Sequence, residues 1–191
     1  MQINPKPQEV GWSVPLDEDY GHAHYDAGQA GDYFAAATQA ALVLAAFRAP
    51  YRGRSSPVNA WWGTFDLAVF LFSGLPADPP SNDVIVRNAA DAQLVEVGWW
   101  PGDTRYPKAA FFAFAHPAPP SFAGASLSPP AARWDHALGE YILDWDDVRA
   151  AADPHAAAVE FGRSAFRHAC LVCGWNTELA ASAESRPPPI R

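Results

Sequence analysis

The order of the predicted elements constrains the fold of this chain more than any single motif does. Helical segments are predicted at residues 27–48 and 154–173, and several strand-like runs lie between them. Parallel sheets need a helical crossover between strands, and these runs follow one another without regular crossovers. The sequence therefore predicts an α+β fold, with an antiparallel β-sheet packed against two long helices.

Both helices carry recognisable end signals. Asp26 stands at the N-cap position, with Gln29 three residues later as in a capping box, and Pro50 stops the first helix. Asp153 is a natural N-cap for the last helix, and Gly174 suits the position just after it. The apolar residues expected on the buried sides are Phe34, Leu42, Val43, Leu44 and Phe47 in the first helix and Val159, Phe161, Phe166, Cys170 and Leu171 in the last.

The strands are predicted from short apolar runs bounded by turn residues. The Pro-Gly-Asp turn at 101–103 separates two of these runs and makes them an antiparallel hairpin. The sheet is expected to contain residues 58–62, 65–72, 93–100, 109–116 and 139–144, and 82–87 is a further short strand candidate.

Composition narrows the class of protein. The chain has 191 residues, of which 49% are hydrophobic, so residues 1–183 are expected to form one domain and 184–191 a disordered tail. The net charge of −8 and the scattered basic residues argue against a nucleic-acid partner. The N-terminus has no apolar signal region and no run matches a membrane span, so we expect a cytoplasmic protein that does not engage a membrane. The 8 Trp and 11 Phe are numerous enough to line a pocket for a small-molecule ligand.

Two short motifs could suggest metal or redox chemistry. Cys170 and Cys173 are spaced as in a redox pair, but they end a helix, where the dipole disfavours a thiolate, and a zinc site needs two further ligands. We expect this pair to be buried, reduced packing residues. His22 and His24 would share one side of an extended segment, which is a weak signal for a metal. Neither a metal nor another cofactor is therefore expected.

The predicted hairpin provides the candidate site. If its turn is centred between residues 104 and 105, Gln93 faces His116 across the two strands. A slip of one residue would move the whole set to the other face. Buried polar groups need partners, so Gln93 and His116 either simply bond each other or line a pocket. On this register one face carries Gln93, Trp99, Phe112, Phe114 and His116.

An earlier strand adds to the same candidate pocket. Asn59 and Trp61 are two residues apart and therefore share a face of their strand. In the functional interpretation His116 is the catalytic acid–base group, because an unperturbed histidine titrates near neutral pH. The expected substrate-binding residues are Asn59, Gln93, Trp61, Trp99, Phe112 and Phe114.

Four long motifs resemble an uncharacterised bacterial family, catalogued as domain of unknown function five-nine-nine-six. They are SSPVNAWWGTFDLAVFLFSG, GWWPG, AAFFAFAHPAPPSF and ALGEYILDWDDVR, within a stretch from about residue 15 to 176. The resemblance implies a divergent member that corresponds to the C-terminal portion of the family and lacks an N-terminal region of additional strands.

The departures from the family pattern fall on the candidate site. The family pattern resembles one with His at the position of Asn59, His and Glu at Ala92 and Gln93, and Tyr at His116. The ionisable set that a divalent metal would prefer is therefore replaced by two amides and a methyl group. His116 supplies a new titratable group instead.

Two classes of function follow from these patterns. The first is a metal-independent enzyme of small-molecule metabolism, such as a specialised biosynthetic pathway, with His116 in an aromatic-walled pocket. The alternative is a non-catalytic small-molecule-binding or assembly module of the same family, and a second alternative is a metal-dependent enzyme that uses His22 and His24. A shortened sheet would also expose an edge or an apolar face, which predicts a homodimer.

Overall fold

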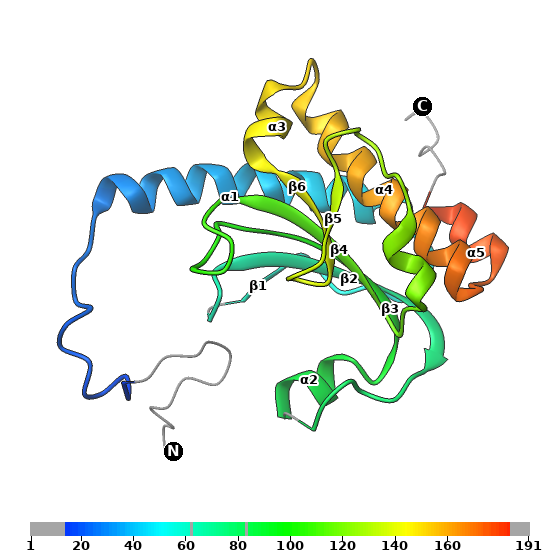
Figure 1. Cartoon of the computed structure of the whole chain (residues 1–191), viewed down its shortest axis with the longest axis horizontal. Helices are drawn as coiled ribbons and strands as arrows, with labels where there is room; N and C mark the ends of the chain where they lie inside the picture. Colours follow the sequence, from blue (N-terminus) through cyan, green and yellow to red (C-terminus); the bar gives the residue numbers. More distant parts are fainter. Residues whose placement is uncertain (1–13, 62, 83, 184–191) are drawn as a thin grey trace, which may run out of the picture.

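Six antiparallel strands form one sheet in the order β1-β2-β3-β4-β6-β5 in the computed structural model, which describes residues 14–61, 63–82 and 84–183 (Figure 1). The predicted α+β class and the two long helices are confirmed. The strands are β1 (Asn59–Trp61), β2 (Asp66–Pro76), β3 (Ala92–Trp100), β4 (Ala110–His116), β5 (Arg133–Asp135) and β6 (Glu140–Asp144). The helices are α1 (Ala27–Arg48), α2 (Val84–Ala89), α3 (Trp145–Ala150), α4 (Pro154–Cys173) and α5 (Thr177–Ser182), with a 3₁₀ turn at Pro120–Gly124.

The five strands predicted from the sequence match β1, β2, β3, β4 and β6 closely. The strand predicted at 82–87 is wrong, because that segment forms the helix α2. The edge strand β5 was not predicted, since a three-residue strand is too short to show a period.

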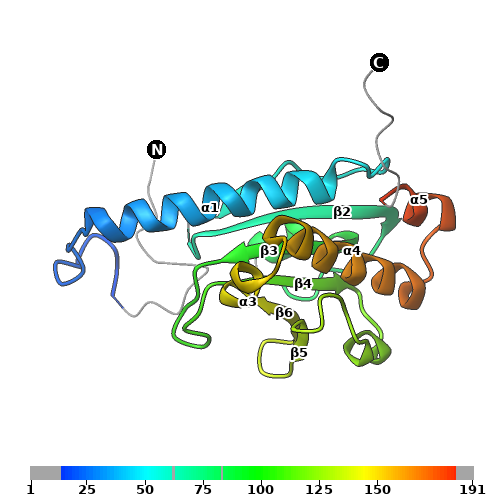
Figure 2. The same cartoon turned by 90° about the horizontal axis from the view of Figure 1, so that it is seen from above.

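The helices α1 and α4 cover one face of the sheet, which we call the covered face (Figure 2). Alternate residues of the strands point into this layer and form a dry apolar core. The largest side chains in it, all less than 2% exposed, include Phe47, Leu71, Trp99, Phe111, Tyr141 and Phe166.

The predicted helix ends are confirmed. The Asp26 side chain accepts a hydrogen bond from the backbone N–H of Gln29 at 2.9 Å, and Asp153 accepts one from Ala156 at 2.9 Å. Gly174 ends α4 with a φ of +67°, a left-handed conformation that glycine adopts without strain.

Three residues predicted to be buried are exposed. Phe34 and Leu42 on α1 are 73% and 56% exposed, and Leu171 on α4 is 80% exposed. Next to Phe34, Tyr33 faces the sheet with its ring 6.0 Å from that of Trp99, so Phe34 lies on the side of α1 that turns away from the sheet. By length and composition α1 could also cross a membrane, a test that the core helix of a soluble protein passes as well. The expected homodimer stays a prediction.

The two cysteines are free thiols at the end of α4. Cys170 is buried as predicted, whereas Cys173 is only partly buried. Burial, together with the neighbouring Cys173, raises the pKa of the Cys170 thiol to about 12, so this thiol is protonated and unreactive at neutral pH.

Candidate functional site

The hairpin of β3 and β4 differs from the predicted register by one residue. Leu94, not Gln93, lies opposite His116, and Glu96 lies opposite Phe114. The turn is responsible, because the Asp103 carboxylate accepts hydrogen bonds from the backbone N–H groups at 105 and 106 and centres the loop half a residue further along. Moving the centre of a hairpin by half a residue shifts every pair by one.

This shift moves Gln93 and Trp99 to the covered face. Trp99 is 1% exposed and belongs to the main core, with its ring 5.7 Å from that of Trp145. The side chain of Gln93 accepts a hydrogen bond from the Ser73 hydroxyl at 3.0 Å. The predicted grouping of Gln93 with His116 and the prediction that Trp99 walls a pocket are therefore wrong.

The remaining predicted residues share the other face of the sheet, which we call the open face. Trp61, Phe114 and His116 line a cavity of about 430 Å³ on it. Phe112 lies beside them in a small second core around Trp100. Asn59 occupies the same face of β1, opposite Ala68, but is not one of the residues that line the cavity.

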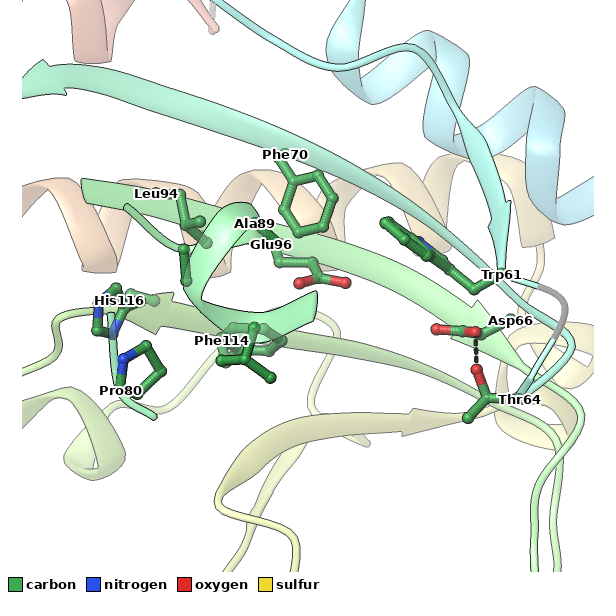
Figure 3. A pocket seen from close by; sticks show the side chains of 13 residues that line it. Trp61, Thr64, Asp66, Phe70, Pro80, Ala89, Leu94, Glu96, Phe114 and His116 are labelled. Atoms are coloured by element: carbon green, nitrogen blue, oxygen red, sulfur yellow. Dashed lines mark hydrogen bonds between the residues drawn. The ribbon is translucent and has the colours of Figure 1, made fainter. Parts of the chain in front are cut away.

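The cavity lies between the sheet and the connection that joins β2 to β3. Strand β2 continues to Pro76, and the chain then leaves the sheet and returns through α2, closed at its base by the hydrogen bond from the N–H of Ala77 to the carbonyl of Asp91 at 3.1 Å. Figure 3 shows α2 crossing over the open face, with Ala89 turned towards the cavity. The helix predicted as a strand therefore roofs the pocket.

Most of the cavity wall is apolar and aromatic. The rings of Trp61 and Phe70 meet edge to face, with centroids 6.0 Å apart and an interplanar angle of 77°. Leu94 and Phe114 continue the wall along β3 and β4. Such a surface suits the apolar body of a small organic molecule.

An acidic group projects into the middle of this wall. Glu96 is 8% exposed, and no hydrogen-bond partner of its carboxyl group is found among the described residues. In Figure 3 the carboxyl group lies between Phe70 and α2, with Asp66 and Thr64 at one end of the cavity and His116 at the other. The Thr64 hydroxyl donates a hydrogen bond to Asp66.

Three carboxyl groups influence one another on the open face. Burial raises the pKa of Glu96 well above its ordinary value, and the charges of Asp66 and Glu140 raise it further. Burial also raises the pKa of Asp66, against the opposing hydrogen bond from Thr64. Burial raises the pKa of Glu140 to about 7, although Arg105 lowers it. The surroundings of Glu96 therefore favour its protonated, neutral form over the carboxylate.

His116 is held by the main chain at the far end of the cavity. Its Nε2 atom lies 2.8 Å from the carbonyl oxygen of Asp78. A carbonyl only accepts, so Nε2 carries the proton and the opposite ring nitrogen, Nδ1, remains for a ligand. The structure thus places His116 at the site, at the end of the cavity opposite Asp66 and Thr64.

The histidines of the metal alternative lie elsewhere. His22 precedes α1 on an exposed segment, with Nδ1 2.8 Å from the carboxylate of Asp19. Within the described ranges no group of three or more His, Cys, Asp or Glu side chains is arranged to hold a metal ion. His24 shares the exposed segment and has no third donor nearby in this part of the chain.

Sequence reasoning missed the two acidic residues of the cavity. Glu96 interrupts the apolar run LVEVGWW, and a single acid inside such a run is a signal for a buried ionisable group. Asp66 directly follows the turn residues between β1 and β2. Glu96 was not recognised as a site residue because the predicted register assigned it to the face of the sheet away from His116.

The chain belongs to the Family of unknown function (DUF5996), whose profile matches residues 1–182. The family predicted from the sequence is thus confirmed, and the match includes the residues ahead of the stretch that carried the resemblance. No curated protein and no solved structure matches the chain significantly.

Proposed function

We propose that this protein is an enzyme that performs acid–base chemistry on a small organic molecule bound in the open-face cavity, with Glu96 as the group that transfers the proton. The observation that carries the proposal is the buried carboxyl group of Glu96, which faces the cavity without a hydrogen-bond partner in the described part of the chain. Folding alone gives no reason to keep a charged residue in such a place, since an apolar side chain would pack there at no desolvation cost.

The surrounding residues suit this chemistry. A carboxyl group with a raised pKa can act as a general acid near neutral pH, and the negative charge of Asp66 keeps that pKa high. Trp61, Phe70 and Phe114 would contact the apolar part of the substrate. His116, first interpreted as the acid–base group, would orient the substrate through Nδ1 at the far end.

One observation favours a binding module without catalysis. The hydrogen bond to Asp78 occupies one of the two ring nitrogens of His116, which suits a histidine that holds its position and contacts a ligand through the other nitrogen. In this alternative Glu96 would only recognise the ligand.

The test has two stages. Compounds from a panel of small organic molecules are first selected when they raise the melting temperature of the wild type but not that of Ala89→Phe, whose new ring would fill the cavity. Conversion of each selected compound is then followed by mass spectrometry for the wild type, Glu96→Gln, His116→Ala and the control Asp32→Asn, which changes an exposed acid on α1.

The expected result is that Glu96→Gln lowers kcat by roughly 100-fold or more, whereas His116→Ala mainly raises KM. Asp32→Asn should behave as the wild type. If Glu96→Gln is fully active and His116→Ala is inactive, the proposal for Glu96 is wrong and His116 is the acid–base group. A compound that binds in the cavity and is never converted would establish the binding module.

A further inference from the structure

The acidic side chains that line the described cavity are not matched by any Lys or Arg. Asp66 and Glu96 lie along one wall, and no Lys or Arg is among the described residues that line the cavity. Glu140 adds a third carboxyl group to the same face, as its effect on the pKa of Glu96 shows. A negatively charged ligand would therefore be repelled, and a positively charged one attracted.

The buried acid still needs a partner. Glu96 is more than nine-tenths buried and has no hydrogen-bond partner in the described ranges, so its oxygens are open to a donor from a ligand. A charged donor forms the strongest hydrogen bond to a carboxylate. That bond is stronger in a cavity shielded from water than in bulk solvent, because the local dielectric constant is lower.

The walls around Glu96 suit an organic cation. Trp61, Phe70 and Phe114 surround the carboxyl group (Figure 3), and the faces of such rings attract cations. A metal ion would need several oxygen or nitrogen ligands at short range, and no such group of three is found in the described chain. An ammonium group needs only one or two acceptors and an aromatic surface.

We infer that the ligand of this cavity is a small organic amine, whose positively charged nitrogen lies beside Glu96 and Asp66 and whose apolar body packs against Trp61, Phe70 and Phe114. This inference rests on the proposed function and names the class of its substrate. It differs from that proposal in requiring a positive charge on the ligand.

Proton release is a direct consequence of such binding. An ammonium group beside Glu96 stabilises the carboxylate, so the proton that Glu96 holds in the empty cavity passes to solvent. If the amine arrives as the free base, the same proton moves from Glu96 to its nitrogen. Affinity for the ammonium form should therefore increase as the pH rises towards the pKa of Glu96.

Three probes of similar shape and different charge test the inference. They are benzylamine, benzyl alcohol and benzoate, titrated into the whole protein by calorimetry at pH 7 in two buffers with different ionisation enthalpies. The wild type is compared with Glu96→Gln and with the control Asp32→Asn. Gln has nearly the shape of Glu but neither charge nor an exchangeable acid proton.

We expect benzylamine to bind the wild type at least tenfold more tightly than benzyl alcohol, with a binding enthalpy that depends on the buffer because a proton is released. Glu96→Gln should lose the tenfold preference and the buffer dependence, and Asp32→Asn should keep both. Equal binding of amine and alcohol, or tighter binding of benzoate, would overturn the ligand class and leave the proposed function standing. If no probe binds the wild type, and Ala89→Phe abolishes no binding found in the compound panel, both proposals fail together.

Discussion

The two faces of the sheet are formed by the same strands, but their side chains are packed differently. On β4, Phe111 is fully buried under α3 and α4, while Phe114 is half-buried beside the cavity. On β3, Trp99 fills the main core, whereas the Glu96 carboxyl group lies in an apolar wall without a hydrogen-bond partner among the described residues. Both of these residues are more than nine-tenths buried, so burial alone does not separate them. The difference lies in what covers each face: a layer of helices on one, and the single short helix α2 over a cavity on the other.

The largest difference between the two faces is expected when one ring on each face of β4 is truncated. Phe111→Ala should lower the free energy of unfolding by about 3–5 kcal/mol, because a dry core cannot fill the hole. Phe114→Ala should lower it by only about 1–2 kcal/mol, since the ring is half-buried and borders a space that already exists. Urea denaturation of both variants measures the two values. Equal losses would show that the open face is a core like the other and that the cavity is closed in solution.

The second prediction concerns the cost of keeping Glu96 on the open face. Because burial raises the pKa of Glu96 in the folded protein, the native state holds this proton where the unfolded chain releases it. The stability of the wild type therefore falls as the pH rises above the unfolded value. At pH 8, Glu96→Gln should be clearly more stable than the wild type, and at pH 4 the two proteins should differ little.

Denaturation of the two proteins at both pH values checks this prediction, with Asp32→Asn as the control on the exposed surface of α1. A Glu96→Gln protein that is less stable than the wild type at pH 8 would mean that the carboxylate has a native partner and that its role is structural.

The effect expected to end at the lowest pH is at Glu140, at the margin of the same face. Burial raises its pKa from 4.5 to about 7, so the stability attached to its protonated form is lost between these values and not above them. Glu140→Gln should therefore gain about 2–3 kcal/mol between pH 4 and pH 7 and show little further gain at pH 8. A gain that continues to grow from pH 7 to pH 9 would contradict the assignment, and stability curves of the variant against the wild type will show it.

The helices and most strands could be predicted because their signals are local. Asp26 and Asp153 cap the helices they precede, and Gly174 provides the left-handed turn after the last one. These features depend on residues three or four positions apart, which the sequence displays directly.

The candidate site could be predicted only in part, because it depends on how strands pair. The face with Phe112, Phe114 and His116 was identified, but its partners on β3 were displaced by one residue through the hydrogen bonds of Asp103 in the turn. Period-two alternation then exchanged Gln93 for Glu96. Hydrogen bonds of side chains inside a loop produce no periodic pattern in the sequence. The one-residue shift in register could therefore not be predicted from periodicity.

The burial of α1 was also beyond sequence reasoning. Its residues are apolar on nearly every side, and only the position of the sheet decides that Val43 and Leu44 are covered and Leu42 is not. A period of 3.6 predicts a face only when the opposite face is polar.

The helix α2, which covers the cavity, belongs to a different segment of the chain from the strands beneath it. The chain between Ala77 and Asp91 leaves the sheet and returns to it at one hydrogen-bonded base, and α2 lies within this excursion. Sequence drift in that segment can reshape the entrance while the strands and the main core keep their packing. Substitutions on α2 should therefore alter the cavity more than they alter the packing of the main core.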